Sequence, residues 1–144
     1  MNRIINLEQM TVSLQDVTVV ANVAVRQLSA VTDKVQHLVS DLLLNEPFAL
    51  GYTIGFTEEA CRRFNKGDDD DVCPDYMGHV IGQMLGNTKV AASFVLFAAS
   101  KRGERYFEGG YDAGTLDFDA WFNSQGEIMP RGLVSHLIQT RGAG

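Results

Sequence analysis

The stretch NEPFALGYTIGFTEEACRRFN, residues 45–65, carries the clearest helical pattern in the chain. Its aromatic and small apolar side chains recur every four residues, a spacing that places them on one face of a helix. These residues are Phe48, Tyr52, Phe56, Ala60 and Phe64. Pro47 suits the first helical turn, where the missing N–H of proline has no consequence. Two pairs spaced for i,i+4 ion pairing support the prediction, Glu58 with Arg62 and Glu59 with Arg63.

Pairs of glycines spaced four residues apart occur in this helix and again in GHVIGQMLG, residues 78–86. An interior glycine costs a helix about 1 kcal/mol relative to alanine, so something must offset it. Ridges without side chains let two backbones approach closely. We predict that the ridge formed by Gly51 and Gly55 packs against the ridge formed by Gly78 and Gly82. The alternative is that a subunit partner or a flat ligand occupies one of the two ridges.

The first 45 residues contain no glycine or proline, and apolar or small residues recur there at alternating spacings of three and four. This heptad pattern predicts a long helix. A continuous helix of 36 residues would span about 54 Å, too long for a compact domain of this size. Either it breaks, near Asn22 or around residues 29–32, or it extends along a partner chain. Positions of helix packing or of an interface include Leu14, Val17, Leu28 and Val31.

The remaining sequence predicts shorter helices separated by loops. NKGDDDDVCPDY is an acidic loop, and Pro74 within it opens the glycine-rich helix. Gly86 and Asn87 are typical of a C-cap followed by a new N-cap. After that we expect a helix over residues 88–107, a break at EGGYDAG, and two short helices over residues 115–123 and 130–140.

These patterns predict one all-α domain over residues 1–144, a helical bundle of five or six helices with a long N-terminal helix or helical hairpin. Residues 1–45 form the heptad-patterned segment, residues 46–140 the helical core and residues 141–144 a flexible tail. Hydrophobic residues make up 45% of the chain and charged residues 21%, which is ordinary for a globular protein.

Charge and hydropathy exclude two classes of partner. Twelve Lys and Arg against eighteen Asp and Glu give a net charge of −6, without the basic face that nucleic-acid binding needs. The longest uncharged apolar run, VAASFVLFAA at residues 90–99, is half of the roughly 20 residues that span a bilayer, and we interpret it as a buried core helix. We therefore expect neither a nucleic-acid nor a membrane partner. No pattern of a secretory signal is seen, and a cytoplasmic location is the expectation.

Few residues suggest chemistry. Cys61, Cys73 and His79 are a candidate metal site, weighed against a buried inert thiol and an exposed histidine. The acidic run at residues 68–71 lacks the alternation of a calcium loop, and YDAGTLDFDAWF lacks the oxygen ligands of one. The sequence contains no P-loop, GxGxxG, HExxH or GxSxG motif. We assign no catalytic residue and no cofactor.

An aromatic-rich stretch, residues 106–122, is explained either as core or as an interaction patch, since Trp and Tyr are favoured at binding hot spots. The candidate patch residues are Tyr106, Tyr111, Trp121 and Phe122.

Taken together, these features favour a noncatalytic protein–protein interaction module, such as an adaptor, assembly factor or small chaperone. It would act as a helical homodimer or bind another protein through an apolar helical groove. The alternative is an all-α protein, with or without enzymatic activity, that binds a small molecule or a metal in its interhelical core.

Overall fold

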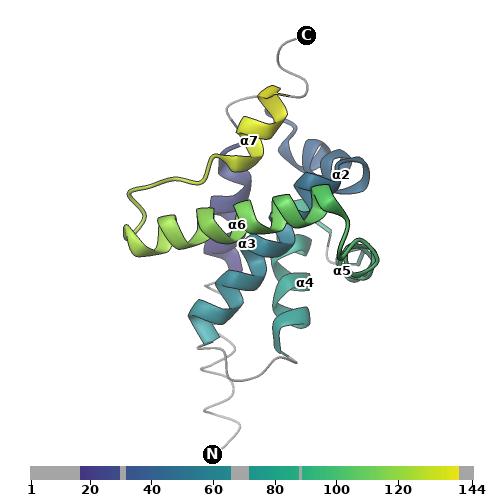
Figure 1. Ribbon diagram of the computed structural model, residues 1–144, viewed down its shortest axis with the longest axis horizontal. Coiled ribbons are helices and arrows are strands. Elements are labelled where there is room, and N and C mark those ends of the chain that lie inside the picture. The colour runs from purple at the N-terminus through teal and green to yellow at the C-terminus, as the bar shows by residue number, and fades with distance from the viewer. Residues whose placement is uncertain (1–16, 30–31, 66–71, 88, 140–144) are drawn as a thin grey trace, which may run out of the picture.

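The computed structural model describes residues 17–29, 32–65, 72–87 and 89–139. Within these ranges the chain forms seven helices and no strand, so the fold is all-α (Figure 1). The number exceeds the expected five or six because the N-terminal segment contributes two helices. No helix of the described ranges is long and apolar enough to cross a membrane.

The N-terminal segment is broken rather than continuous. A first helix covers residues 17–26, and α2 covers Val35–Asn45. Between them Ser29 Oγ donates to the carbonyl of Arg26 at 2.7 Å, and Thr32 Oγ1 accepts from the Lys34 N–H at 3.0 Å. Side chains that compete in this way for backbone groups favour turns over helix. A long continuous helix was therefore the wrong alternative for this segment, and the break around residues 29–32 the right one.

The heptad positions that the structure describes face the chain's own core. Val17 and Leu28, together with Ala21 and Ala24 between them, are almost completely buried in one cluster with the other helices. Val17 and Leu28 are thus helix-packing positions within one chain. Leu14 and Val31 lie outside the described residues, as do the acidic run at residues 68–71 and the tail at residues 141–144.

At the centre of the molecule lies α3, Pro47–Asn65. Every residue from Ala49 to Thr57 is buried, as expected of a helix whose whole circumference is covered by other elements. It contacts α2 and four later helices: α4 (Val72–Leu85), α5 (Ala91–Ala99), α6 (Arg105–Asn123) and α7 (Gly132–Leu137). Figure 1 shows α6 crossing α3, with the other helices around this pair.

Glycines mark where α4 ends and where α5 and α6 separate. Gly86, with φ +70°, follows the last turn of α4, and the Asn87 N–H donates to the carbonyl of Gly82 at 2.9 Å, as a glycine C-cap requires. Gly103, with φ +90°, lies in the turn between α5 and α6. The helix expected over residues 88–107 is therefore two helices.

The sequence predicted a break at EGGYDAG, residues 108–114, where the structure has a continuous helix. This stretch lies inside α6, which runs unbroken through three glycines to Asn123. Glu104 caps the N-terminus of this helix, since its carboxylate accepts from the N–H groups of Tyr106 and Phe107 at 3.3 and 3.1 Å. The reason for the error lies in how α6 meets α3.

Candidate functional site

Glycines from both helices form the crossing of α3 and α6. A Cβ atom placed on Gly51 would lie 2.0 Å from the carbonyl oxygen of Phe107, and one on Gly110 would lie 2.0 Å from that of Phe48. The second pair repeats the arrangement, with Gly55 against the carbonyl of Tyr111 at 2.2 Å and Gly114 against that of Tyr52 at 2.1 Å. Only glycine permits this approach, because any Cβ would overlap the opposite backbone.

The ridge of Gly51 and Gly55 thus has a different partner from the one predicted. It packs on α6, whereas a Cβ on Gly78 would meet no atom of the described residues within 4 Å. Gly82 is buried in α4. The true partner ridge, Gly110 and Gly114, has the same four-residue spacing and was missed because its segment was interpreted as a loop.

A buried polar network joins α3 to α6 and α7. The Tyr52 hydroxyl donates to Asp117 Oδ2 at 2.5 Å, and the same oxygen accepts from the N–H groups of Gly132 at 2.8 Å and Arg131 at 3.3 Å. Burial, followed by the neighbouring Asp117 carboxylate, raises the pKa of Tyr52 far above its usual value. The phenol is therefore held in its neutral form, as a donor.

Gln27, in the turn after the first helix, completes this network. Its Oε1 accepts from the N–H groups of Leu133 at 2.9 Å and Val134 at 3.1 Å, at the start of α7. Its Nε2 donates to the Ala24 carbonyl at 3.2 Å and to the Tyr52 hydroxyl at 3.4 Å. Sequence periodicity cannot predict the contact between Gln27 and α7, because Gln27 lies more than 100 residues from Leu133 and Val134. The network fixes α7 in place.

Ion pairs link the C-terminal half of α3 to the outer side of α6. Arg63 Nη2 lies 2.9 Å from Asp119 Oδ1. Arg62 Nη1 lies 3.4 Å from Glu58 Oε1, and the Tyr111 hydroxyl donates to the same carboxylate. Burial, together with the bond to Glu58, raises the pKa of Tyr111. Exposed pairs of this kind contribute little stability individually, so we do not assign the stability of the helix crossing to this cluster.

The four candidate patch residues do not form one surface. Trp121 and Phe122 are half-buried and pack against the buried ring of Phe118, with ring centroids at 5.6 and 5.7 Å. Tyr111 is partly buried beside α3, and Tyr106 is exposed. Most of the aromatic cluster is therefore core, and Tyr106 alone of the four lies well out on the surface.

The candidate metal ligands are placed in different environments. Cys61 is buried in the core on α3, whereas His79 is exposed on α4. The side chain of Cys73 lies outside what the structure describes. Among the described side chains, no three His, Cys, Asp or Glu residues are grouped so that they could hold a metal ion.

The most apolar exposed feature is α5, with the sequence AASFVLFAA and no charged residue. One side of it is buried through Ala91, Phe94 and Ala98. The opposite side is exposed, and Leu96 retains 73% of its accessible surface. This exposed side, the α5 outer face, is Val90, Ala92, Ser93, Leu96, Phe97 and Ala99.

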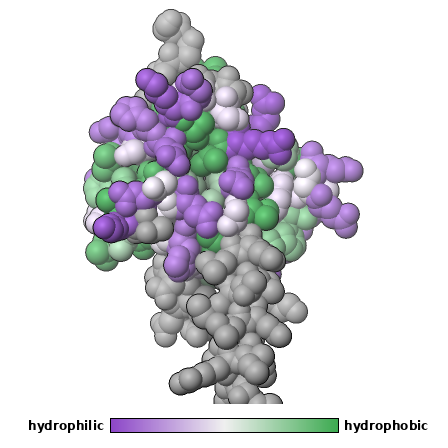
Figure 2. Space-filling view, turned by 180° about the vertical axis from the view of Figure 1, so that it is seen from behind, coloured by the Kyte–Doolittle hydropathy of each residue, from purple (hydrophilic) through white to green (hydrophobic). Residues whose placement is uncertain are grey.

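Figure 1 places α5 at one edge of the molecule, away from the α3–α6 crossing. The rear view in Figure 2 shows further apolar side chains reaching the surface between hydrophilic ones. Single exposed apolar side chains are normal on a folded protein. A contiguous apolar patch is instead typical of an interaction site.

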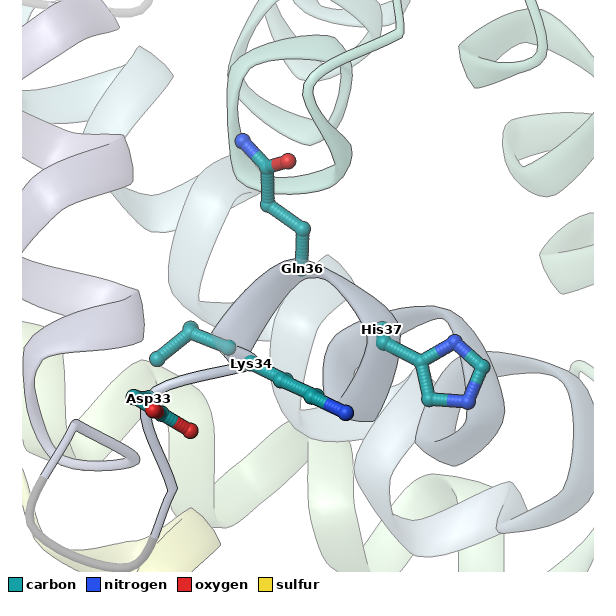
Figure 3. Close-up of a pocket in the computed structure, with 5 residues that line it drawn as sticks. Asp33, Lys34, Gln36 and His37 are labelled. Atoms are coloured by element: carbon teal, nitrogen blue, oxygen red, sulfur yellow. The ribbon is translucent and has the colours of Figure 1, made fainter.

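A hollow lies at the start of α2, with a volume of about 590 Å³ (Figure 3). Its described lining is Asp33, Lys34, Val35, Gln36 and His37. Lys34 and His37 point to the same side, and Gln36 points away from them, toward Gly86 at the end of α4. The polar lining residues are exposed, and this part of the chain offers no base beside a nucleophile. We therefore do not interpret the hollow as an active site.

Comparison of the chain with models of protein families, with curated proteins and with solved structures found no match. Function is therefore inferred from the chain's own geometry, in which the α5 outer face is the most apolar exposed side of a described helix.

Proposed function

We propose that the protein is a noncatalytic protein–protein interaction module that forms a homodimer through the α5 outer face. The observation that carries this proposal is a nine-residue helix without a charge whose outer side is exposed. A surface helix normally presents polar residues to solvent, and a helix that is apolar on all sides is normally buried.

The energetic reason lies in two side chains. Leu96 is 73% exposed and Phe97, whose ring lies under the Lys101 ammonium, is 37% exposed. Complete burial of a fully exposed side chain of this kind contributes roughly 1.5–3 kcal/mol, so Leu96 has most to gain and Phe97 less. The surrounding alanines and Ser93 let a second element approach closely. A partner that covers this face would gain most of its affinity from these two residues, as is usual at interaction hot spots.

The occupant that we propose is a second copy of the chain. Lys89 and Lys101 border α5 at its two ends. The exposed side of α6 combines Tyr106 and Leu116 with two charged residues, Asp112 and Arg105, and the guanidinium of Arg105 lies over the Tyr106 ring. A two-fold dimer in which α5 of each copy packs on α6 of the other would bring apolar residues together and lysines opposite the aspartate. Such reciprocal contacts are what an isologous interface requires.

The N-terminal heptad pattern gives this proposal indirect support. Its described positions are used within the chain, where Val17 and Leu28 are buried. We therefore place the proposed interface on α5 instead of on the heptad positions.

A cytoplasmic location remains part of the proposal. Two cysteines in 144 residues suit a compartment in which disulfides are rare.

Leu96→Lys tests the role of α5. We expect the purified chain to have twice its 15.8 kDa mass, and the variant to be monomeric, because a lysine ammonium cannot be buried in an apolar contact. Light scattering after size-exclusion chromatography measures this directly. The melting temperature of the monomer should hardly change, because substitutions at exposed positions usually alter stability by no more than about 0.5 kcal/mol.

Leu44→Lys is the matched control, since Leu44 is 56% exposed on α2, outside the proposed interface. This variant should remain dimeric. The proposal fails if the unaltered chain is monomeric, or if both lysine variants dimerise equally well.

A further inference from the structure

A second, smaller cavity lies where the turn after the first helix meets the connection from α6 to α7. Its volume is about 270 Å³, and its described lining is Arg26, Gln27, Met129, Pro130, Arg131 and Val134. Three of these residues, Met129, Pro130 and Val134, form an apolar wall. The two arginines are exposed, so their guanidinium groups are available to a ligand that enters from solvent.

These two arginines differ from the other arginines that the structure describes. The guanidinium groups of the other four have partners: Arg62 and Arg63 pair with glutamates, Arg102 with Glu108, and Arg105 lies over the Tyr106 ring. Neither Arg26 nor Arg131 has an ion pair, a side-chain hydrogen bond or a ring contact with any described residue. Within the described part of a chain whose net charge is −6, these two guanidinium groups thus have no carboxylate partner at the cavity.

Two polar side chains beside the cavity, Gln27 and Asp117, are already engaged in other hydrogen bonds. Gln27 uses both its oxygen and its nitrogen to hold Ala24, Tyr52 and the start of α7. Asp117 Oδ2 already accepts from the Tyr52 hydroxyl and from two backbone N–H groups. The described lining contains no carboxylate of its own. The donors available to a ligand are therefore the two guanidinium groups, whose planar geometry matches a carboxylate.

We propose that this cavity binds a small organic carboxylate. The carboxylate lies between Arg26 and Arg131, and a short apolar chain contacts Met129, Pro130 and Val134. The volume sets the size of the ligand, because it is below the roughly 300 Å³ at which pockets for drug-sized molecules begin. The apolar wall distinguishes the ligand from an inorganic anion, which would gain nothing from it. The site is separate from the α5 outer face.

NMR titration of the full chain with sodium butyrate at constant ionic strength tests this proposal. We expect saturable shifts of the Arg26 and Arg131 side-chain Nε–H signals. Butyramide, which has the same shape without the charge, and inorganic phosphate, which has charge without the apolar chain, should each bind about tenfold more weakly.

Arg26→Gln and Arg131→Gln should each weaken butyrate binding by about fivefold or more, since each removes one charged guanidinium group. Arg105→Gln, at an exposed arginine on α6, is the control and should bind as the unaltered chain does. Arg26→Lys and Arg131→Lys keep the charge and should give intermediate affinity, which separates loss of the site from loss of the fold.

Three results would overturn the proposal. Butyrate could fail to saturate, butyramide or phosphate could bind as tightly as butyrate, or the glutamine variants could retain full affinity.

Discussion

The phenol of Tyr52 lies where residues of three other segments meet. It donates to Asp117 of α6, accepts from Gln27 after the first helix, and Asp117 in turn holds the N–H groups at the start of α7. Buried polar groups of this kind stabilise a fold only while all of them have partners. A single hydroxyl therefore connects the helix crossing to the C-terminal helix.

Tyr52→Phe should lower the free energy of unfolding by about 1–3 kcal/mol, because it leaves a half-buried carboxylate and a half-buried amide each without one partner. Denaturant unfolding at neutral pH measures this. Tyr106→Phe is the control, since Tyr106 is exposed, and should change stability by no more than about 0.5 kcal/mol. Equal stability of the two variants would show that the network contributes nothing.

Tyr52 also makes the free energy of unfolding depend on pH in the alkaline range. The pKa of Tyr52 is raised in the folded protein, so the folded state retains this proton above pH 10 while the unfolded chain loses it. The stabilisation is therefore complete below about pH 10 and declines as the pH rises further, by at most about 1.4 kcal/mol per pH unit. The decline between pH 9 and 11 should be steeper in the unaltered chain than in Tyr52→Phe.

At the scale of helices, sequence patterns located α3 and both ends of α6 but missed the middle of α6. Phe48, Tyr52 and Phe56 repeat every four residues, and this period alone identifies the central helix. In α6 the three glycines of EGGYDAG carry the propensity of a loop. Two of them, Gly110 and Gly114, pack against α3, which lies more than 50 residues away in sequence. Local propensity cannot represent this contact, which keeps the segment helical.

Sequence patterns also could not identify the distant contacts in the rest of the candidate site. The spacing of Gly51 and Gly55 correctly indicated a close helix contact, but spacing alone does not identify the partner. The apolar composition of residues 90–99 was clear from the sequence. Their exposure was not, because an apolar run is expected to be core. The Gln27 contact and the two arginines at the cavity depend on the tertiary arrangement.

Gly110→Ala tests the helix crossing. Helix propensity alone would stabilise this variant by about 1 kcal/mol, but its Cβ would lie 2.0 Å from the Phe48 carbonyl. We expect a net loss of about 2 kcal/mol or more, because the two backbones must separate.

Gly78→Ala is the control for that experiment, since a Cβ there meets no described atom within 4 Å. It should raise the melting temperature, as propensity alone predicts. Stabilisation by Gly110→Ala of the same size would mean that α3 and α6 do not approach as closely as the structure shows. Thermal unfolding followed by circular dichroism distinguishes the two results.

For the whole molecule, a compact core contrasts with one uncovered helix. The described heptad positions, the glycine ridges of the α3–α6 crossing and most aromatic residues are used within the chain. The apolar surfaces that remain exposed include the α5 outer face, bordered by Lys89 and Lys101, and a side of α6 where Leu116, 68% exposed, lies beside Asp112. We propose that the two faces cover each other between copies, with opposite charges at the edges fixing the orientation.

Sedimentation velocity on charge-reversed variants tests this proposal most directly. Lys89→Glu and Asp112→Lys should each weaken the dimer, because each places like charges opposite one another across the proposed interface. The double variant restores opposite charges and should dimerise nearly as well as the unaltered chain. A double variant no stronger than the two single variants, or an unaltered chain that stays monomeric throughout the concentration range, would contradict the proposed dimer.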